Sequence, residues 1–205
     1  MEDSAFEIDI SNRQSALRFD ENSLHAAVLK ALAIEQVSSA VLSISIVDNS
    51  AIHVINRDHL QHDYPTDVIS FQLDFVSADE LQADDDFEDE IEDEEQELTD
   101  DEEDFADDVD DVGSDELLNE GRAAGASIEG EIVASAEMAA TMAGDGKWSA
   151  EAELILYVVH GLLHICGYDD LTPEEKCIMR ARERAILSEL GLTAIYAEDA
   201  EEDRH

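Results

Sequence analysis

His160 and His164 stand four residues apart in the run HGLLHICGYDD. Residues i and i+4 of a helix project from one face, so the two imidazoles are expected side by side, within reach of one ion. The residues around them are apolar nearly all round, which predicts a buried helix. A buried imidazole with an unmet nitrogen costs on the order of 1 to 3 kcal/mol, and a shared metal ion removes that cost. The spacing therefore favours a metal site.

A third ligand is expected from the turn that follows. Gly167 can adopt the left-handed conformation that ends a helix, and the chain beyond it can bring Asp170 back toward the histidines. Three protein ligands and one open position are typical of a catalytic zinc ion, whereas a structural zinc prefers four ligands. We therefore predict one Zn²⁺ per chain, held by His160, His164 and Asp170. The alternative left open is that both imidazoles bond to backbone or carboxylate partners.

Two neighbours of these ligands bear on the chemistry. Asp169 is the nearest group that can hold the second nitrogen of a histidine or stabilise the turn, and it can equally cap the helix end and face water. Metalloproteases of the HExxH class place a glutamate general base after the first histidine, but this chain has Gly161 there. The protease mechanism therefore lacks its base, and no general base is assigned.

The elements that must position these groups follow from hydrophobic periodicity. Period-two alternation predicts four strands, marked by Phe6, Ile8 and Ile10; Leu42, Ile44 and Ile46; Ile69, Phe71, Leu73 and Phe75; and Ile132, Ala134 and Ala136. Helices are expected from Asn22 or Ser23 to about Ile34, near 50–60, from about Glu137, over 149–166, and from Pro173 to about Leu190. The predicted fold class is α+β: a single four-stranded mixed sheet with helices packed on it, and the metal-site helix near the C-terminus.

The charge of the chain restricts its partners. Its 205 residues include 54 acidic and 11 basic side chains, a formal net charge of -43. From Asp79 to Glu120, 25 of 42 residues are acidic and none is basic, yet the remainder is acidic as well. Nonspecific nucleic-acid binding requires Lys and Arg to neutralise phosphates, so any contact with RNA must be local or metal-assisted. No DNA partner is expected.

The acidic stretch is predicted to be an insertion in an otherwise single metal-hydrolase-like domain over residues 1–205. From about 77 to 127 the scattered apolar side chains bury too little area to offset chain entropy, which predicts disorder. A solvated loop is favoured over a regulatory or partner-binding segment, and the charge also raises the hypothesis that the segment mimics nucleic acid. Residues 197–205 are predicted to be an acidic C-terminal tail.

Nothing in the sequence predicts export or a membrane partner. The N-terminal MEDSAFEID lacks the basic segment and the apolar core of a signal peptide, and the longest apolar run, 154–166, is shorter than the roughly 20 residues that cross a bilayer. Cys166 and Cys177 give no disulfide framework and are expected to be buried or half-buried thiols. The expected location is the cytoplasm.

Several separated motifs resemble one family. HGLLHICGYDD is similar to the HGxLHxxGYDH signature of the YbeY family. INRDHLQHDYPTDVISF (55–71) resembles its LNxxYRxxDxPTDVLSFP block, GEIVASAE (130–137) its GDIxIS strand, and EEKCIMRARERAIL (174–187) its closing helix. The resemblance covers almost the whole chain except the acidic insertion and the tail.

The resemblance implies a zinc-dependent, single-strand-specific endoribonuclease that acts in ribosomal RNA maturation and ribosome quality control. The partners it implies are ribosomal RNA, the small ribosomal subunit and assembly proteins. By analogy Thr66, Asp67 and Ser70 line the substrate cleft, although Thr and Asp after Pro are also ordinary turn residues.

Two positions depart from the family pattern. The third ligand of the family is histidine, and Asp170 in its place brings negative charge, which weakens the Lewis acid and allows another divalent ion. Alignment on Asn56 and Pro65 places Leu60 where the family block has arginine, and the nearby Arg57 is predicted to lie on another helix face. The alternative function is a ribosome-assembly binding factor with a structural metal and little or no nuclease activity.

Overall fold

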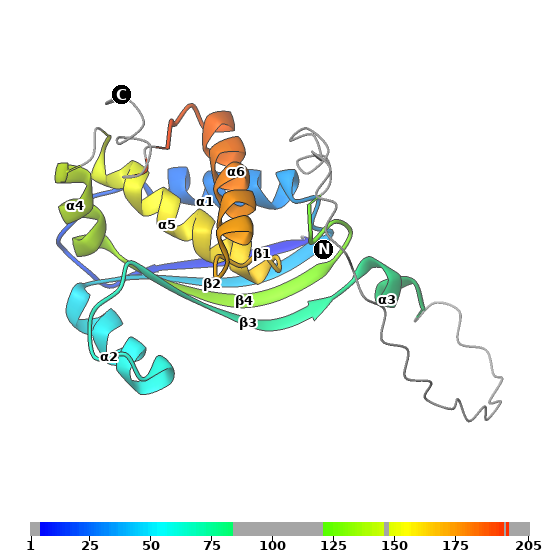
Figure 1. Ribbon diagram of the computed structural model, residues 1–205, viewed down its shortest axis with the longest axis horizontal. Coiled ribbons are helices and arrows are strands. Elements are labelled where there is room, and N and C mark those ends of the chain that lie inside the picture. Colours follow the sequence, from blue (N-terminus) through cyan, green and yellow to red (C-terminus); the bar gives the residue numbers. More distant parts are fainter. Residues whose placement is uncertain (1–4, 84–120, 146–147, 195, 197–205) are drawn as a thin grey trace.

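Four strands form one mixed sheet in the order β1-β2-β4-β3 (Figure 1). The computed structural model describes residues 5–83, 121–145, 148–194 and 196. The strands are β1 (Phe6–Asn12), β2 (Ser39–Val47), β3 (Val68–Val76) and β4 (Ser127–Ser135). β1, β2 and β4 run parallel, and β3 pairs antiparallel with β4 at the edge. The predicted α+β class with a four-stranded mixed sheet is confirmed.

The helices lie on both faces of this sheet (Figure 1). They are α1 (Glu21–Ile34), α2 (Asn49–Leu60), α3 (Ala78–Ala83), α4 (Ala136–Asp145), α5 (Ala150–Ile165) and α6 (Pro173–Glu189). α1, α5 and α6 cover one face and share the main core with it, whereas α2 packs on the other face through a small apolar cluster around Ile52 and Ile69. α5 therefore lies between the sheet and α6, which places its histidines within reach of side chains from α6.

The helices begin where side chains cap them. Ser149 accepts a hydrogen bond from the backbone N–H of Ala152, and Thr172 forms the predicted capping box with Glu175. The predicted cap of α1 at Asn22 or Ser23 is wrong: Asp20 is the cap, because its carboxylate accepts from the N–H of Asn22.

The apolar alternation in β3 does not mark a single face. Ile69 and Phe71 pack toward α2, but Leu73 is an extra residue in the register with β4 and is 57% exposed. Phe75 beyond this bulge packs into the main core on the opposite face. The predicted fourth strand was also too long, since Ala136 begins α4.

The predicted insertion at about 77–127 lies mostly outside the described residues, as does the predicted tail at about 197–205. Both ends of the insertion belong to the folded domain: α3 follows β3 directly, and residues 121–126 form a turn with Ala123 and Ala126 buried. The predicted boundaries were therefore too wide, and disorder over 84–120 stays a prediction. Cys166 is buried as expected, whereas Cys177 is exposed. Within the described chain, no helix has the length and apolar character to span a bilayer.

Candidate metal centre

Gly161 brings the histidine helix close to the sheet. A Cβ atom at this position would lie 3.1 Å from Cγ2 of Ile132 and 3.2 Å from Cγ2 of Val68, closer than side chains normally pack. The glycine at the position of the protease general base thus has a packing role, since it lets α5 settle on β3 and β4.

The structure brings the three predicted metal ligands together. The Nε2 atoms of His160 and His164 face each other at 3.2 Å. Oδ2 of Asp170 lies 4.0 Å from Nε2 of His160, and Oδ1 of Asp170 lies 4.0 Å from Nε2 of His164. Gly167 ends the helix with a φ of +88°, and this turn returns Asp170 toward the histidines, as predicted. One ligand atom from each residue falls within 4.8 Å of the other two.

The second nitrogen of each histidine is held by an acceptor. Nδ1 of His160 lies 2.7 Å from Oε1 of Glu183, and Nδ1 of His164 lies 3.0 Å from the backbone carbonyl oxygen of Tyr168. Both partners can only accept, so each neutral ring carries its proton on Nδ1. The two Nε2 atoms then turn lone pairs toward each other.

This donor set fits a divalent cation. Two opposed lone pairs repel, and a cation between them removes the repulsion. Two ligands at 2.0 to 2.1 Å from a tetrahedral zinc are about 3.4 Å apart, close to the 3.2 Å between the Nε2 atoms of His160 and His164. The carboxylate of Asp170 has to approach further, and its side chain is 39% exposed with room to move. Whether these residues bind a metal stays a prediction.

Glu183 is the functional residue that the sequence reasoning missed. Its side chain is buried, and its other carboxylate oxygen accepts a hydrogen bond from the hydroxyl of Tyr196. Burial alone would lower the pKa of His160, but the hydrogen bond and negative charge of Glu183, with Asp170 and Asp67, outweigh it, so this pKa is raised. A carboxylate in this position also makes the histidine a more basic ligand.

Among the described residues, Asp169 forms no hydrogen bond or ion pair with His160 or His164. Its Oδ1 accepts a hydrogen bond from the backbone N–H of Asp170 at 2.8 Å. Of the roles proposed for Asp169, the structure therefore favours stabilising the turn, and the histidine nitrogens go to Glu183 and Tyr168 instead.

A buried ionic network supports the same turn. The hydroxyl of Tyr168 donates to Oε2 of Glu35 at 2.8 Å, and Arg182 forms an ion pair with Oε1 of Glu35 at 2.7 Å. The guanidinium of Arg122 donates to the carbonyl oxygen of Gly167 at 2.9 Å. The turn is thus tied to the end of α1, to α6 and to the segment before β4.

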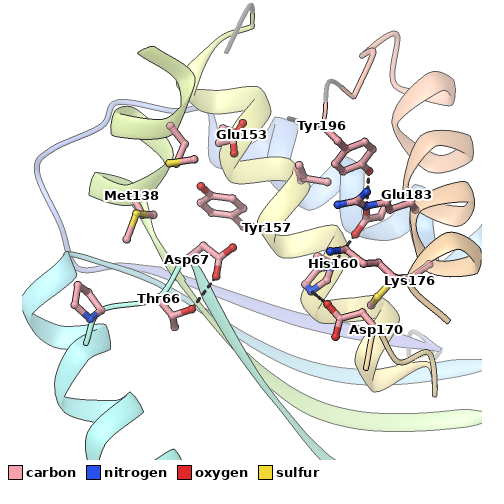
Figure 2. A pocket seen from close by; sticks show the side chains of 15 residues that line it. Thr66, Asp67, Met138, Glu153, Tyr157, His160, Asp170, Lys176, Glu183 and Tyr196 are labelled. Atoms are coloured by element: carbon pink, nitrogen blue, oxygen red, sulfur yellow. Dashed lines mark hydrogen bonds and ion pairs between the residues drawn. The ribbon is translucent and has the colours of Figure 1, made fainter. Parts of the chain in front are cut away.

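A cleft of about 460 Å³ opens beside the histidines (Figure 2). Thr66 and Asp67 lie on its side toward β3, where the Thr66 hydroxyl donates to Oδ1 of Asp67, while His160 and Asp170 lie on its side toward α6. Its walls are formed by Pro65, Thr66, Asp67, Met138, Met142, Glu153, Leu156, Tyr157, His160, Asp170, Lys176, Met179, Arg180, Glu183 and Tyr196. Ser70, which was expected in the cleft, lies under α5 instead, next to Gly161.

The α2 residues at the family arginine position lie elsewhere. Leu60 is 44% exposed and outside the lining of the cleft, and Arg57 pairs with its neighbour Asp58 at 2.9 Å. Neither residue brings a positive charge to the cleft in this structure.

Comparison with known proteins shows the family of the chain. The family model described as Endoribonuclease YbeY matches residues 9–191. Relatives named Endoribonuclease YbeY include one from Rhodopirellula baltica, 32% identical over 96% of this chain and 78% of that protein. Another, from Desulfitobacterium hafniense, is 34% identical over 82% of this chain and 84% of its own length. A solution structure from Thermotoga maritima aligns over 90% of this chain and 91% of that one, with 18% identity and a TM-score of 0.47. Because the family model and these relatives match most of the sequence, the chain belongs to the YbeY family of endoribonucleases.

Proposed function

We propose that this protein is a metal-dependent endoribonuclease that holds one Zn²⁺ through His160, His164 and Asp170 and cuts single-stranded RNA. The observation that carries the proposal is the pair of Nε2 atoms at 3.2 Å, which face each other beside a carboxylate at the edge of a cleft. Because Asp170 adds negative charge to the site, another divalent ion is a second candidate.

The chain's own residues prepare the site for hydrolysis. When bound, the ion supplies Lewis acidity, which acidifies water and polarises a phosphoryl oxygen. Glu183 and the carbonyl of Tyr168 fix the orientation and the tautomer of the two rings, so that their Nε2 atoms point toward each other. The buried contacts of Glu35 with Tyr168 and Arg182 hold the turn that precedes Asp170, and so keep this third ligand close to the histidines.

We further propose that the substrate is ribosomal RNA, and that the protein acts in the cytoplasm on the small ribosomal subunit, with assembly proteins, in RNA maturation and ribosome quality control. Membership in an endoribonuclease family supports an RNA substrate. The competing hypothesis is an assembly factor that binds the ribosome and keeps its metal for structure alone. It is favoured by Leu60 at the family arginine position and by the acidic surface.

The first prediction tests metal dependence. The purified full-length protein is expected to contain about one divalent ion per chain by elemental analysis and to cut single-stranded RNA but not duplex RNA. His160→Ala and His164→Ala should each lose the ion and the cleavage, because each removes one of three ligands. His25→Ala is the matched control, since His25 lies on α1, is partly exposed and does not line the cleft.

Two results would contradict the proposal. A preparation stripped of metal that still cuts RNA would show that the ion is not needed. A fully loaded protein that associates with the small subunit but cuts no RNA would favour the binding-factor hypothesis.

A further inference from the structure

One stripe of α6 forms a wall of the cleft. Lys176, Met179, Arg180 and Glu183 all line it, and their spacing of i, i+3, i+4 and i+7 places them on one face of the helix. At one end of this stripe Glu183 bonds directly to Nδ1 of His160. Arg180 stands about one turn from Glu183, and Lys176 lies about 6 Å further along the helix axis. Figure 2 shows Lys176 and Glu183 extending from the α6 side toward His160 and Asp170.

The guanidinium of Arg180 is held beside the metal site by an aromatic ring. Its Cζ atom lies 4.7 Å from the ring centroid of Tyr196, and the hydroxyl of the same tyrosine donates to Glu183. A continuous series of contacts therefore joins His160 to Arg180 through Glu183 and Tyr196. A stacked guanidinium loses less conformational freedom when it binds a ligand, and its planar donors match the geometry of a phosphate.

The charges of the cleft make these two residues distinctive. Among the described residues that line it, Asp67, Glu153, Asp170 and Glu183 are acidic, and Lys176 and Arg180 are the cations. A phosphodiester that approaches a chain of net charge -43 is repelled unless cations close to the site offset that field. Helix α2 does not supply such cations to the cleft, because Leu60 is apolar and Arg57 pairs with Asp58 outside the cleft.

We infer that Lys176 and Arg180 form a binding site for backbone phosphates of single-stranded RNA, located on α6 within one to two turns of the residue that orients His160. The inference rests on the proposed function, because it assumes that RNA enters this cleft. It adds which helix positions the strand and which two side chains take its charge. The ordinary alternative is that both cations only neutralise the carboxylates around them.

Steady-state cleavage of single-stranded RNA by the Zn²⁺-loaded full-length protein, measured over a range of salt concentrations, separates these roles. Lys176→Gln and Arg180→Gln should each raise KM several-fold and make the slope of log kcat/KM against log salt shallower by about 0.7, as expected for one lost phosphate contact on a single strand. Arg180→Lys keeps the charge and should restore the slope. The matched control is Arg184→Gln: Arg184 contacts the same Tyr196 ring at 4.8 Å but is exposed and does not line the cleft, so the slope should not change.

Metal content and thermal unfolding of each variant are measured in parallel. If Lys176→Gln and Arg180→Gln retain the wild-type slope and KM, or if their only effect is on metal content or unfolding temperature, the inference is overturned and the cations merely balance the local carboxylates. If the loaded wild-type protein neither binds nor cuts RNA, the proposed function fails and takes this inference with it. If the wild-type protein cuts RNA but the variants keep the wild-type salt slope, the inference is overturned and the proposed function stands.

Discussion

At the scale of single residues, the three candidate ligands differ in how firmly they are held. Each histidine is fixed at both ends of its ring, by α5 and by an acceptor at Nδ1. Asp170 has neither constraint: its side chain is 39% exposed, and its carboxylate lies 4.0 Å from the histidine nitrogens. In the proposed metal site Asp170 is the adjustable candidate ligand, and its carboxylate would have to move inward to bind an ion.

Asp170 and Asp169 form a matched pair for testing this difference. Asp170→Asn removes the negative charge that draws the side chain toward the ion, so zinc affinity should fall about 10- to 100-fold. Asp169→Asn keeps an oxygen that can accept from the N–H of Asp170, so its affinity should stay close to the wild-type value. Competition with a chromogenic chelator measures both constants. Equal losses in the two variants would mean that Asp170 acts through the turn and not as a ligand.

The grouping of the three candidate ligands was easier to predict from the sequence than the side chains that support it. A spacing of four on a helix and a glycine after it are local signals, so His160, His164 and the return of Asp170 could be inferred from one short run. Glu183 lies 23 residues from His160 and on another helix, and no local rule joins them. A signal was present nonetheless: Glu183 shares the buried stripe of α6 with Met179 and Ile186, and an acid among buried positions calls for a partner.

At the scale of elements, the turn after α5 connects the candidate site to α1 and α6. The backbone carbonyl of Tyr168 accepts a hydrogen bond from His164, and its hydroxyl donates to Glu35 at the end of α1. Arg182 from α6 forms an ion pair with the same carboxylate. Burial and the negative charge of Glu35 raise the pKa of Tyr168 to about 12. The neutral phenol is therefore part of what holds α1, α6 and the turn together.

Tyr168→Phe should weaken these contacts while leaving the candidate metal ligands in place. The variant leaves a buried oxygen of Glu35 without its donor, so unfolding free energy at neutral pH should fall by roughly 1 to 3 kcal/mol. The contribution of the phenol is full below the ordinary pKa of 10.0 and is lost as pH rises toward the folded pKa of about 12. Denaturant unfolding should thus show the gap between wild type and variant narrowing over that pH range.

Metal content is the built-in control for this variant. The atom that holds His164 is the backbone carbonyl of residue 168, which phenylalanine also has. Zinc stoichiometry should therefore match the wild type. If the difference in unfolding free energy between wild type and Tyr168→Phe stays constant from pH 10 to 12, the pKa of Tyr168 is not raised in the folded protein, and this prediction is wrong.

The elements themselves were largely predictable from the sequence, and the exceptions have physical causes. Caps and glycines gave α5 and α6 to within a residue or two. The face of β3 was not predictable, because the single extra residue at Leu73 reverses the alternation and leaves no mark in the pattern of apolar residues.

At the scale of the whole molecule, the distribution of charge sets how RNA can approach. Of the 54 acidic residues, 23 lie between positions 84 and 120, and none of the basic ones does. The described residues that flank this segment belong to the folded domain: Arg122, just past it, contacts the turn that leads to Asp170, and Ala78 before it lies against Gly125. The charge of the segment therefore adds to a field that repels phosphates.

Deleting residues 84–120 and joining the ends by a short Gly/Ser linker should speed the encounter with RNA. At low salt, removing a repulsive field of this kind is expected to raise kcat/KM at least 10-fold, an order-of-magnitude figure for electrostatic control of association. In about 1 M salt, where the screening length falls to about 3 Å, the two proteins should become alike. A variant in which residues 84–120 are replaced by a Gly/Ser segment of the same length separates the effect of charge from that of bulk. If repulsion is the cause, its kcat/KM at low salt should match that of the deletion variant. Equal rates at low salt would show that the acidic segment does not screen the cleft, and a gain that persists at high salt would point to steric obstruction instead.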